Sequence, residues 1–179
     1  MPIASTDLVY KYSVATGPGN STVGTALSSN GGFISTTPVP DAVLDNIFDD
    51  VTGDENAVMN VDYKCVFLHN QHATLTLQAA RLWIAAEVAG GANSALALDN
   101  IGVTVLANAT AQAGANTTED TLPAGAGVFS SPTTKAGGIL IGNIPAGSVV
   151  AIWLRRSATN SAAQNSDGLT FRVEGDTAS

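Results

Sequence analysis

The most concentrated group of chemically active side chains is an acidic stretch in the first third of the sequence. Seven of the 15 Asp and Glu residues lie there: Asp41, Asp45, Asp49, Asp50, Asp54, Glu55 and Asp62. Four of them, Asp49, Asp50, Asp54 and Glu55, surround Gly53, and carboxylates around a glycine turn are ligands that Ca²⁺ accepts. The spacing does not match an EF-hand loop, in which Gly follows three alternating ligands and Glu closes the loop. We therefore predict no metal. The favoured interpretation is a solvated turn that caps backbone amides or contacts a partner's arginines, and calcium is the alternative.

The sequence does not provide the groups that hydrolysis requires. A nucleophile needs an adjacent base, which is most often histidine, and the chain has only His69 and His72. No Gly-x-Ser-x-Gly elbow occurs, and Cys65 lies within an apolar alternation that predicts a buried core residue. The two histidines could ligate a metal, but further ligands are not evident, so polar residues of a turn are the favoured interpretation. We predict a protein that is not an enzyme, with no catalytic residues and no cofactor.

The basic residues are few, and Arg155 and Arg156 form their only adjacent pair. The net charge of −8 argues against direct nucleic-acid binding, which needs a basic surface to displace counterions. Arginine is enriched at interfaces and pairs bidentately with carboxylates, so Arg155 and Arg156, together with Asp49 and Asp50, are candidate interface residues. An equally good interpretation is a charged pair that shields an edge strand from aggregation.

The composition indicates a cytoplasmically made protein suited to assembly. Charged residues make up 12% of the 179-residue chain, about half the usual fraction, and a weakly charged surface is easily desolvated in contacts with other proteins. A single cysteine excludes an intramolecular disulfide. The N-terminus has no basic segment followed by an apolar run, which predicts no signal peptide, and no apolar stretch is long enough to span a bilayer.

Short apolar runs separated by Gly and Pro predict a series of β-strands. The predicted strands cover residues 7–14, 33–36, 59–70, 74–88, 96–98, 102–106, 128–129, 138–141, 148–156 and 169–174. A change of phase predicts a β-bulge at residues 78–80, where a helix over 79–89 is the competing interpretation. Asp41–Phe48 is predicted to be a helical turn with Asp41 as its N-cap. The polar stretches 16–32 and 107–126 are predicted to be loops.

This pattern predicts an all-β fold, an immunoglobulin-like or jelly-roll-like β-sandwich with one short helical turn. Residues 1–40 are expected to form an N-terminal strand and an extended arm. Residues 41–179 are expected to form the sandwich. We see neither an internal repeat nor the alternation of strands and helices that a parallel sheet would require.

Several segments together resemble a group of uncharacterised virion proteins of tailed bacteriophages. The resemblance is carried by residues 46–56 and 62–70, by Ile144–Gly147 and Ile152–Arg156, and by the closing residues 174–177. It implies a virion structural protein, most readily a capsid decoration (cement) protein that bridges major capsid protein subunits. The implied location is the capsid surface, after assembly in the host cytoplasm. The implied partners are the major capsid protein and further copies of this chain, as a trimer or dimer, without a membrane or direct nucleic-acid contact.

Two other classes remain open. Within a virion, the alternative is a β domain associated with the tail, baseplate or fibre. Outside that class, a carbohydrate-binding module would share the sandwich, but such a module usually exposes aromatic side chains in its loops. Here the aromatic residues fall mainly in predicted strands, so the structural interpretation is favoured.

Overall fold

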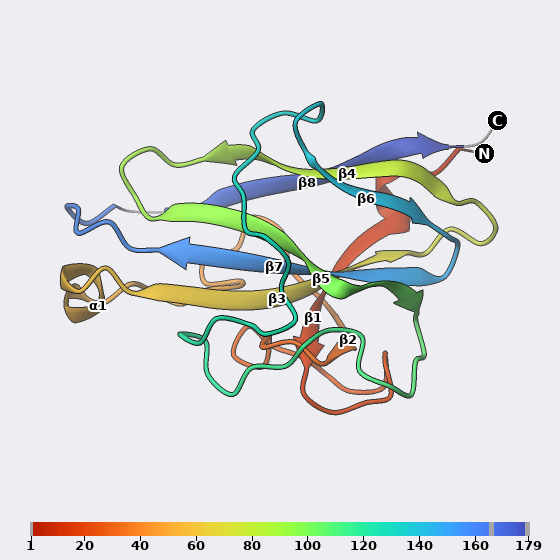
Figure 1. The fold of residues 1–179 in the computed structure, drawn as a ribbon, viewed down its shortest axis with the longest axis horizontal. Helices are drawn as coiled ribbons and strands as arrows, with labels where there is room; N and C mark the ends of the chain where they lie inside the picture. The colour runs from red at the N-terminus through yellow and green to blue at the C-terminus, as the bar shows by residue number, and fades with distance from the viewer. Residues whose placement is uncertain (1, 165–166, 178–179) are drawn as a thin grey trace.

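The computed structural model describes residues 2–164 and 167–177 and shows a sandwich of two antiparallel β-sheets (Figure 1). A 3₁₀ turn, η1 (Ser5–Asp7), precedes the first strand, and the single short helix is α1 (Gly53–Ala57) in the described part of the chain. The strands are β1 (Leu8–Val14), β2 (Phe33–Pro38), β3 (Val61–Asn70), β4 (Leu77–Glu87), β5 (Asn93–Val105), β6 (Ile139–Ile144), β7 (Ser148–Ser157) and β8 (Leu169–Thr177). The larger sheet has the order β2-β1-β3-β7-β5 and the smaller one β6-β4-β8. The predicted all-β sandwich is confirmed. No helix of the described residues is long and apolar enough to cross a bilayer.

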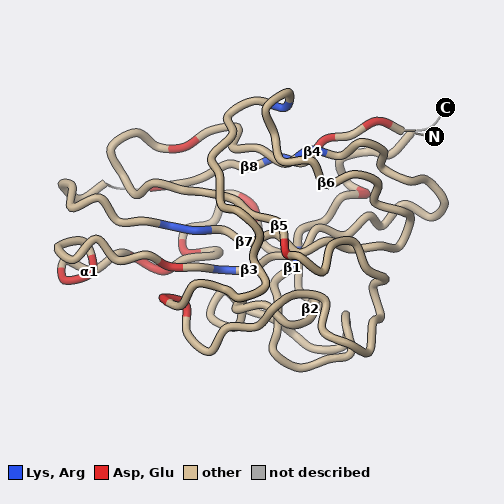
Figure 2. Tube along the Cα trace, viewed as in Figure 1, with Lys and Arg blue, Asp and Glu red and all other residues tan. Residues whose placement is uncertain are grey.

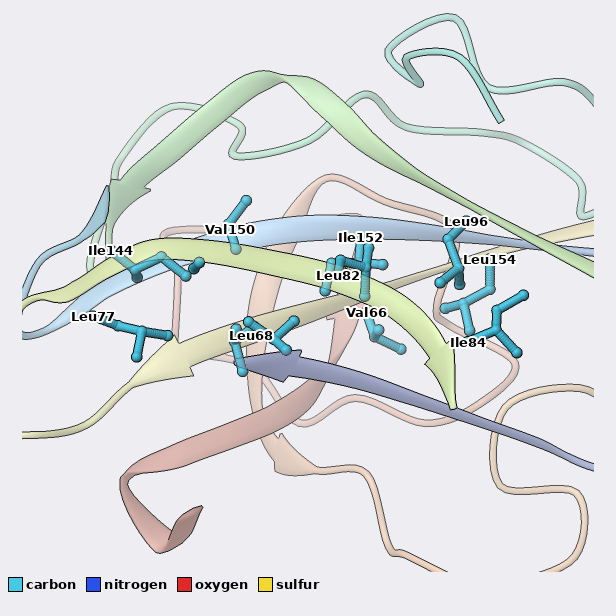
Figure 3. Close-up of a cluster of buried hydrophobic side chains, with 12 residues drawn as sticks. Val66, Leu68, Leu77, Leu82, Ile84, Leu96, Ile144, Val150, Ile152 and Leu154 are labelled. Carbon is cyan, nitrogen blue, oxygen red and sulfur yellow. The ribbon is translucent and has the colours of Figure 1, made fainter. Parts of the chain in front are cut away.

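The main core lies between the two sheets. Alternate residues of β3, β4 and β7 point into it, as the two-residue period of a strand requires. Figure 3 shows these side chains; the labelled ones are Val66, Leu68, Leu77, Leu82, Ile84, Leu96, Ile144, Val150, Ile152 and Leu154. Full burial of each Val, Leu or Ile contributes about 1.5–3 kcal/mol, so this cluster is the principal stabilising element of the fold. An edge-to-face contact between Tyr10 and Phe171, with ring centroids 5.0 Å apart, joins the sheets at β1 and β8.

A second core covers the opposite face of the larger sheet. Its buried members are Ile34, Cys65, Phe67, Ala97, Ala113, Val149, Ala151 and Trp153. Two long loops, residues 15–32 and 106–129, lie over this face, and we call them the loop layer (Figure 1). Because both faces of β7 are covered, every residue from Ser148 to Leu154 is buried. A strand buried on both sides reads as a continuous apolar run, which explains why this segment does not alternate.

The loop layer is attached to the sheet through its backbone. The Cys65 amide in β3 donates to the Ser29 carbonyl at 2.7 Å, and the Tyr63 amide donates to the Glu119 carbonyl at 2.7 Å. β1 and β2, which the sequence analysis assigned to a separate N-terminal segment 1–40, are hydrogen-bonded into the larger sheet. In this chain, residues 15–32 therefore pack against their own domain.

Most predicted strands are present with small shifts of their ends. Residues 77–87 form a strand, β4, so the competing helix over 79–89 is wrong. The predicted bulge is confirmed: the pairing register of β4 shifts between Gln78 and Arg81, and Ala79 has a φ of 49°. The two strands predicted at 96–98 and 102–106 are one strand, β5, whose register with β7 shifts between Leu98 and Val103. Residues 128–129 are not in a strand.

The helical turn predicted at Asp41–Phe48 is wrong. Ala42 and Asp45 have φ values of 53° and 54°, in the left-handed region, which a right-handed helix excludes. The Asp41 carboxylate accepts a hydrogen bond from the adjacent Ala42 amide at 3.0 Å instead of capping a helix. The apolar spacing arises because Ile47 and Phe48 pack against the main core from an irregular loop, while Val43 and Leu44 remain exposed.

Candidate functional site

Arg156 is the centre of an ion-pair network within the chain. Register places it opposite Asp62, and its Nε and Nη2 donate to Asp62 Oδ2 at 3.1 and 2.8 Å. Nη2 also donates to Asp49 Oδ1 at 3.2 Å, and Nη1 donates to the Asp49 carbonyl. The guanidinium lies 4.8 Å from the ring centroid of Phe48, a cation–π geometry. The side chains of Arg156 and Asp62 are 12% and 5% exposed, so this network attaches the irregular loop at Phe48–Asp49 to the larger sheet.

Arg155 points to the other face of the same strand. Its guanidinium lies 5.5 Å from the ring centroid of Phe129, at the border of the loop layer, and its Nε is buried without a hydrogen-bond partner among the described residues. The two arginines therefore do not form one basic patch. Arg156 is engaged by Asp49 and Asp62 of its own chain, and Arg155 packs against an aromatic ring.

The four calcium candidates do not converge on one site among the described residues. Glu55 accepts hydrogen bonds from the Thr52 amide and hydroxyl, each at 2.8 Å, in the capping box that starts α1. These hydrogen bonds, from the backbone first, hold the pKa of the Glu55 carboxyl below its usual value. Asp49 is paired with Arg156. Among residues 2–164 and 167–177, no three His, Cys, Asp or Glu side chains are grouped so that they could hold a metal ion. The Thr52-x-x-Glu55 spacing was the sequence signal for this helix.

A polar hollow of about 400 Å³ lies between the start of β3 and the loop layer. Its charged lining is Glu55, Asp62, Lys64, Glu119 and Asp120. Lys64 is buried and paired with Glu119 at 2.6 Å, so it neutralises one of the four carboxylates. This ion pair was not predicted from the sequence. The only signal was a lysine directly before the apolar run 65–68 of β3.

Two buried polar side chains hold the loop layer in place, and neither was identified from the sequence. The Gln112 amide oxygen accepts from the Ile34 amide at 3.1 Å, and its nitrogen donates to the Val105 carbonyl at 2.7 Å. Asp99 accepts from the Gly114 amide and from the Trp153 indole, each at 2.9 Å. Because both residues lie in weakly patterned sequence, only the tertiary structure reveals them.

The remaining candidate residues, Cys65, His72 and His69, are packed or hydrogen-bonded within the fold. Cys65 is fully buried, as predicted, and burial raises the pKa of its thiol, which keeps it protonated and unreactive. His72 Nδ1 accepts hydrogen bonds from the Thr74 and Leu75 amides at 3.1 and 3.0 Å, as the turn interpretation predicts. His69 is buried on β3 beneath the loop layer.

The surface of the loop layer is nearly free of charge. Residues 15–32 contain no charged side chain, and residues 106–129 contain only Glu119 and Asp120. Figure 2 shows this as uninterrupted tan tube around β2, whereas acidic residues gather near α1. The same loops expose large aliphatic side chains, which are between 63% and 90% exposed: Val23, Leu27, Leu122 and Val128. An uncharged surface carrying exposed aliphatic groups is suited to contact with another protein.

No protein-family model, curated protein sequence or solved structure was found to match this chain.

Proposed function

We propose that this protein is a virion structural protein, a capsid decoration protein that contacts the major capsid protein through its loop layer. The observation that carries the proposal is the uncharged loop-layer surface with its exposed Val23, Leu27, Leu122 and Val128. Burying such a surface removes apolar area from water without desolvating charges, which makes the contact favourable over a wide area.

The interior of the protein supports a mechanical role. Both faces of the larger sheet are packed, and buried hydrogen bonds from Gln112 and Asp99 hold the loop layer on the sheet. A rigid surface loses little conformational entropy on binding, so more of the contact energy is available for association. Repetition over many copies in a shell, with homo-oligomers linking neighbouring sites, multiplies a modest contact energy into substantial resistance to internal pressure.

The aromatic side chains favour this proposal over a carbohydrate-binding module. All ten lie in the described part of the chain, and each is buried or partly buried. Sugar-binding surfaces commonly present a flat exposed aromatic ring, and such a platform is absent from residues 2–164 and 167–177. A tail, baseplate or fibre-associated domain would use the same surface, and copy number separates it from a capsid protein.

Rebinding to shells tests the proposal. Purified protein is added to capsids stripped of it, and bound protein and shell melting temperature are measured. We expect binding at a fixed stoichiometry and an increase in shell melting temperature. Leu27→Asp and Val128→Asp in the loop layer should abolish binding, whereas Leu140→Asp on β6, a comparably exposed aliphatic position outside the loop layer, should bind normally.

Two results would contradict the proposal. One is recovery of the protein only in tail fractions of dissociated particles, in six or a few multiples of six copies. The other is equal loss of binding in the Leu140→Asp control, because that would place the contact outside the loop layer.

A further inference from the structure

Lys11 is a buried lysine without a carboxylate partner. It lies in β1 and is 7% exposed, and it takes part in none of the ion pairs of the described residues. Its Nζ donates a hydrogen bond to Asn20 Oδ1 at 2.8 Å. Burial lowers the pKa of this amine, which increases the fraction present as the neutral nucleophile. The other buried lysine, Lys64, is by contrast neutralised by Glu119.

The loop holds Asn20 firmly against this amine. Asn20 has a φ of 59°, a left-handed conformation that asparagine tolerates. Its backbone N–H donates to the Ile34 carbonyl at 2.7 Å. The preceding Gly19 amide donates to the Asn108 carbonyl at 2.9 Å. A Cβ on Gly19 would collide with the Leu106 carbonyl, so the backbone approaches closely here because residue 19 is glycine. The carboxamide of Asn20 is therefore fixed next to Lys11 Nζ.

A proton acceptor lies on the same sheet face. Val9 pairs with His69 and Lys11 with Phe67, so Lys11 and His69 are diagonal neighbours. His69 is 6% exposed, and its Nδ1 is buried without a hydrogen-bond partner among the described residues. Burial, and secondly the charge of Lys11, lower the pKa of His69 to about 4, so its imidazole is neutral at pH 7.

We propose that Lys11 and Asn20 become joined by an isopeptide bond between Nζ of Lys11 and Cγ of Asn20. Nζ attacks Cγ, the bond from Cγ to Nδ2 breaks, and Nδ2 leaves with the protons released by Nζ. Overall, the lysine ammonium and the asparagine carboxamide give a secondary amide and an ammonium ion, without any oxidant or added reactant. His69 accepts a proton from Nζ and returns it to the leaving nitrogen.

The proximity of Lys11 and Asn20 increases the rate of this step. Two groups held in contact react as if at very high concentration, which favours formation of the amide. The bond would join β1 covalently to the loop layer, independently of the proposed capsid role.

Intact-mass spectrometry of the purified full chain tests the proposal. We expect a mass below that of the sequence by about 17 Da, the mass of the ammonia lost. Trypsin should fail to cleave after Lys11, so residues 1–64 should remain one peptide, and its tandem mass spectra should show an internal ring closed between Lys11 and Asn20. A mass equal to that of the sequence, unchanged after prolonged incubation of the folded protein at pH 7–9, would overturn the proposal.

Variants separate this bond from other ammonia losses. Lys11→Arg and Asn20→Ala should have the full mass of their sequences, whereas Lys64→Arg, at the other buried lysine, should retain the loss. Cyclisation of Asn20 onto its own backbone would also release ammonia, but it would persist in Lys11→Arg, and that result would overturn the isopeptide bond. His69→Gln should slow the loss at pH 7, and an unchanged rate would overturn the part assigned to His69.

Discussion

The indole Nε1 of Trp153 donates a hydrogen bond to the Asp99 carboxylate at 2.9 Å inside the second core. Trp153 comes from the centre of β7 and Asp99 from β5, and the same carboxylate oxygen accepts the Gly114 amide of the loop layer. One buried carboxylate therefore accepts a hydrogen bond from the sheet and another from the loop that covers it. The hydrogen bond to Asp99 also explains how the Trp153 indole, which carries a polar N–H group, can be fully buried.

Asp99→Ala is expected to destabilise the fold by about 3 kcal/mol, because two buried donors lose their acceptor. Asp99→Asn keeps an acceptor oxygen and should lose less. Urea unfolding followed by tryptophan fluorescence measures both values. Equal stability of Asp99→Ala and the wild type would show that water replaces the carboxylate without cost.

Asp62→Ala is expected to cost about 3 kcal/mol, because it leaves the Arg156 guanidinium half-buried without its main partner. Arg156→Ala should cost a similar amount, and the double variant should be less destabilised than the sum of the two. The matched control is Lys135→Ala, which breaks an exposed pair with Glu174 at 3.7 Å and should change stability by less than about 0.5 kcal/mol. Strict additivity of the two substitutions would contradict a direct coupling.

Ala79→Gly is expected to stabilise the protein by about 0.5–1 kcal/mol. Ala79 has a φ of 49° at the β4 bulge, where glycine avoids the steric cost of Cβ. Ala86→Gly is the control: Ala86 is exposed on the same strand without a positive φ, so glycine should destabilise it. Thermal unfolding of the two variants compares the signs, and destabilisation by both would contradict strain at the bulge.

His69 is expected to make stability dependent on pH between about 6.5 and 4. Because the folded-state pKa is about 4, below the unfolded value near 6.5, the unfolded chain binds a proton first as the pH falls. The contribution of His69 to the free energy of unfolding is therefore fully present above pH 6.5 and declines toward pH 4. The decline is up to about 3 kcal/mol relative to a variant without this group. Urea midpoints of the wild type and His69→Gln between pH 4 and 8 measure the difference, and parallel pH profiles would contradict the burial of a neutral imidazole.

The sequence was informative where local pattern decides structure. Alternation identified the start of β3, a continuous apolar run identified β7, and the change of phase near Ala79 identified the bulge. These features follow from the two-residue period and the burial of a strand, which local sequence reveals. The same reasoning failed at Asp41–Phe48, where apolar spacing came from an irregular loop packed on the core. The capping box at Thr52 marked the true helix, but it lay within a stretch interpreted through its charge.

The candidate site was harder to foresee. Arg156 and Asp49 were predicted to contact another protein, and in the structure Arg156 donates a hydrogen bond to Asp49 of the same chain, 107 residues away. The Lys11–Asn20 contact depends on how a polar loop folds back, and no periodicity encodes it. The loop layer itself has no pattern, because its side chains are positioned by long-range hydrogen bonds from residues such as Gln112.

The position of Cys65 gives the chain a built-in reporter of its folding order. Because the second core packs loop residues onto the larger sheet, we expect the loop layer to close after that sheet has formed. Cys65 is the only thiol in the sequence, and it is fully covered once its amide has paired with Ser29. A thiol reagent added during refolding would therefore label molecules in which the loop layer has not yet packed on the sheet. Time-resolved labelling would give the rate at which the loop layer packs.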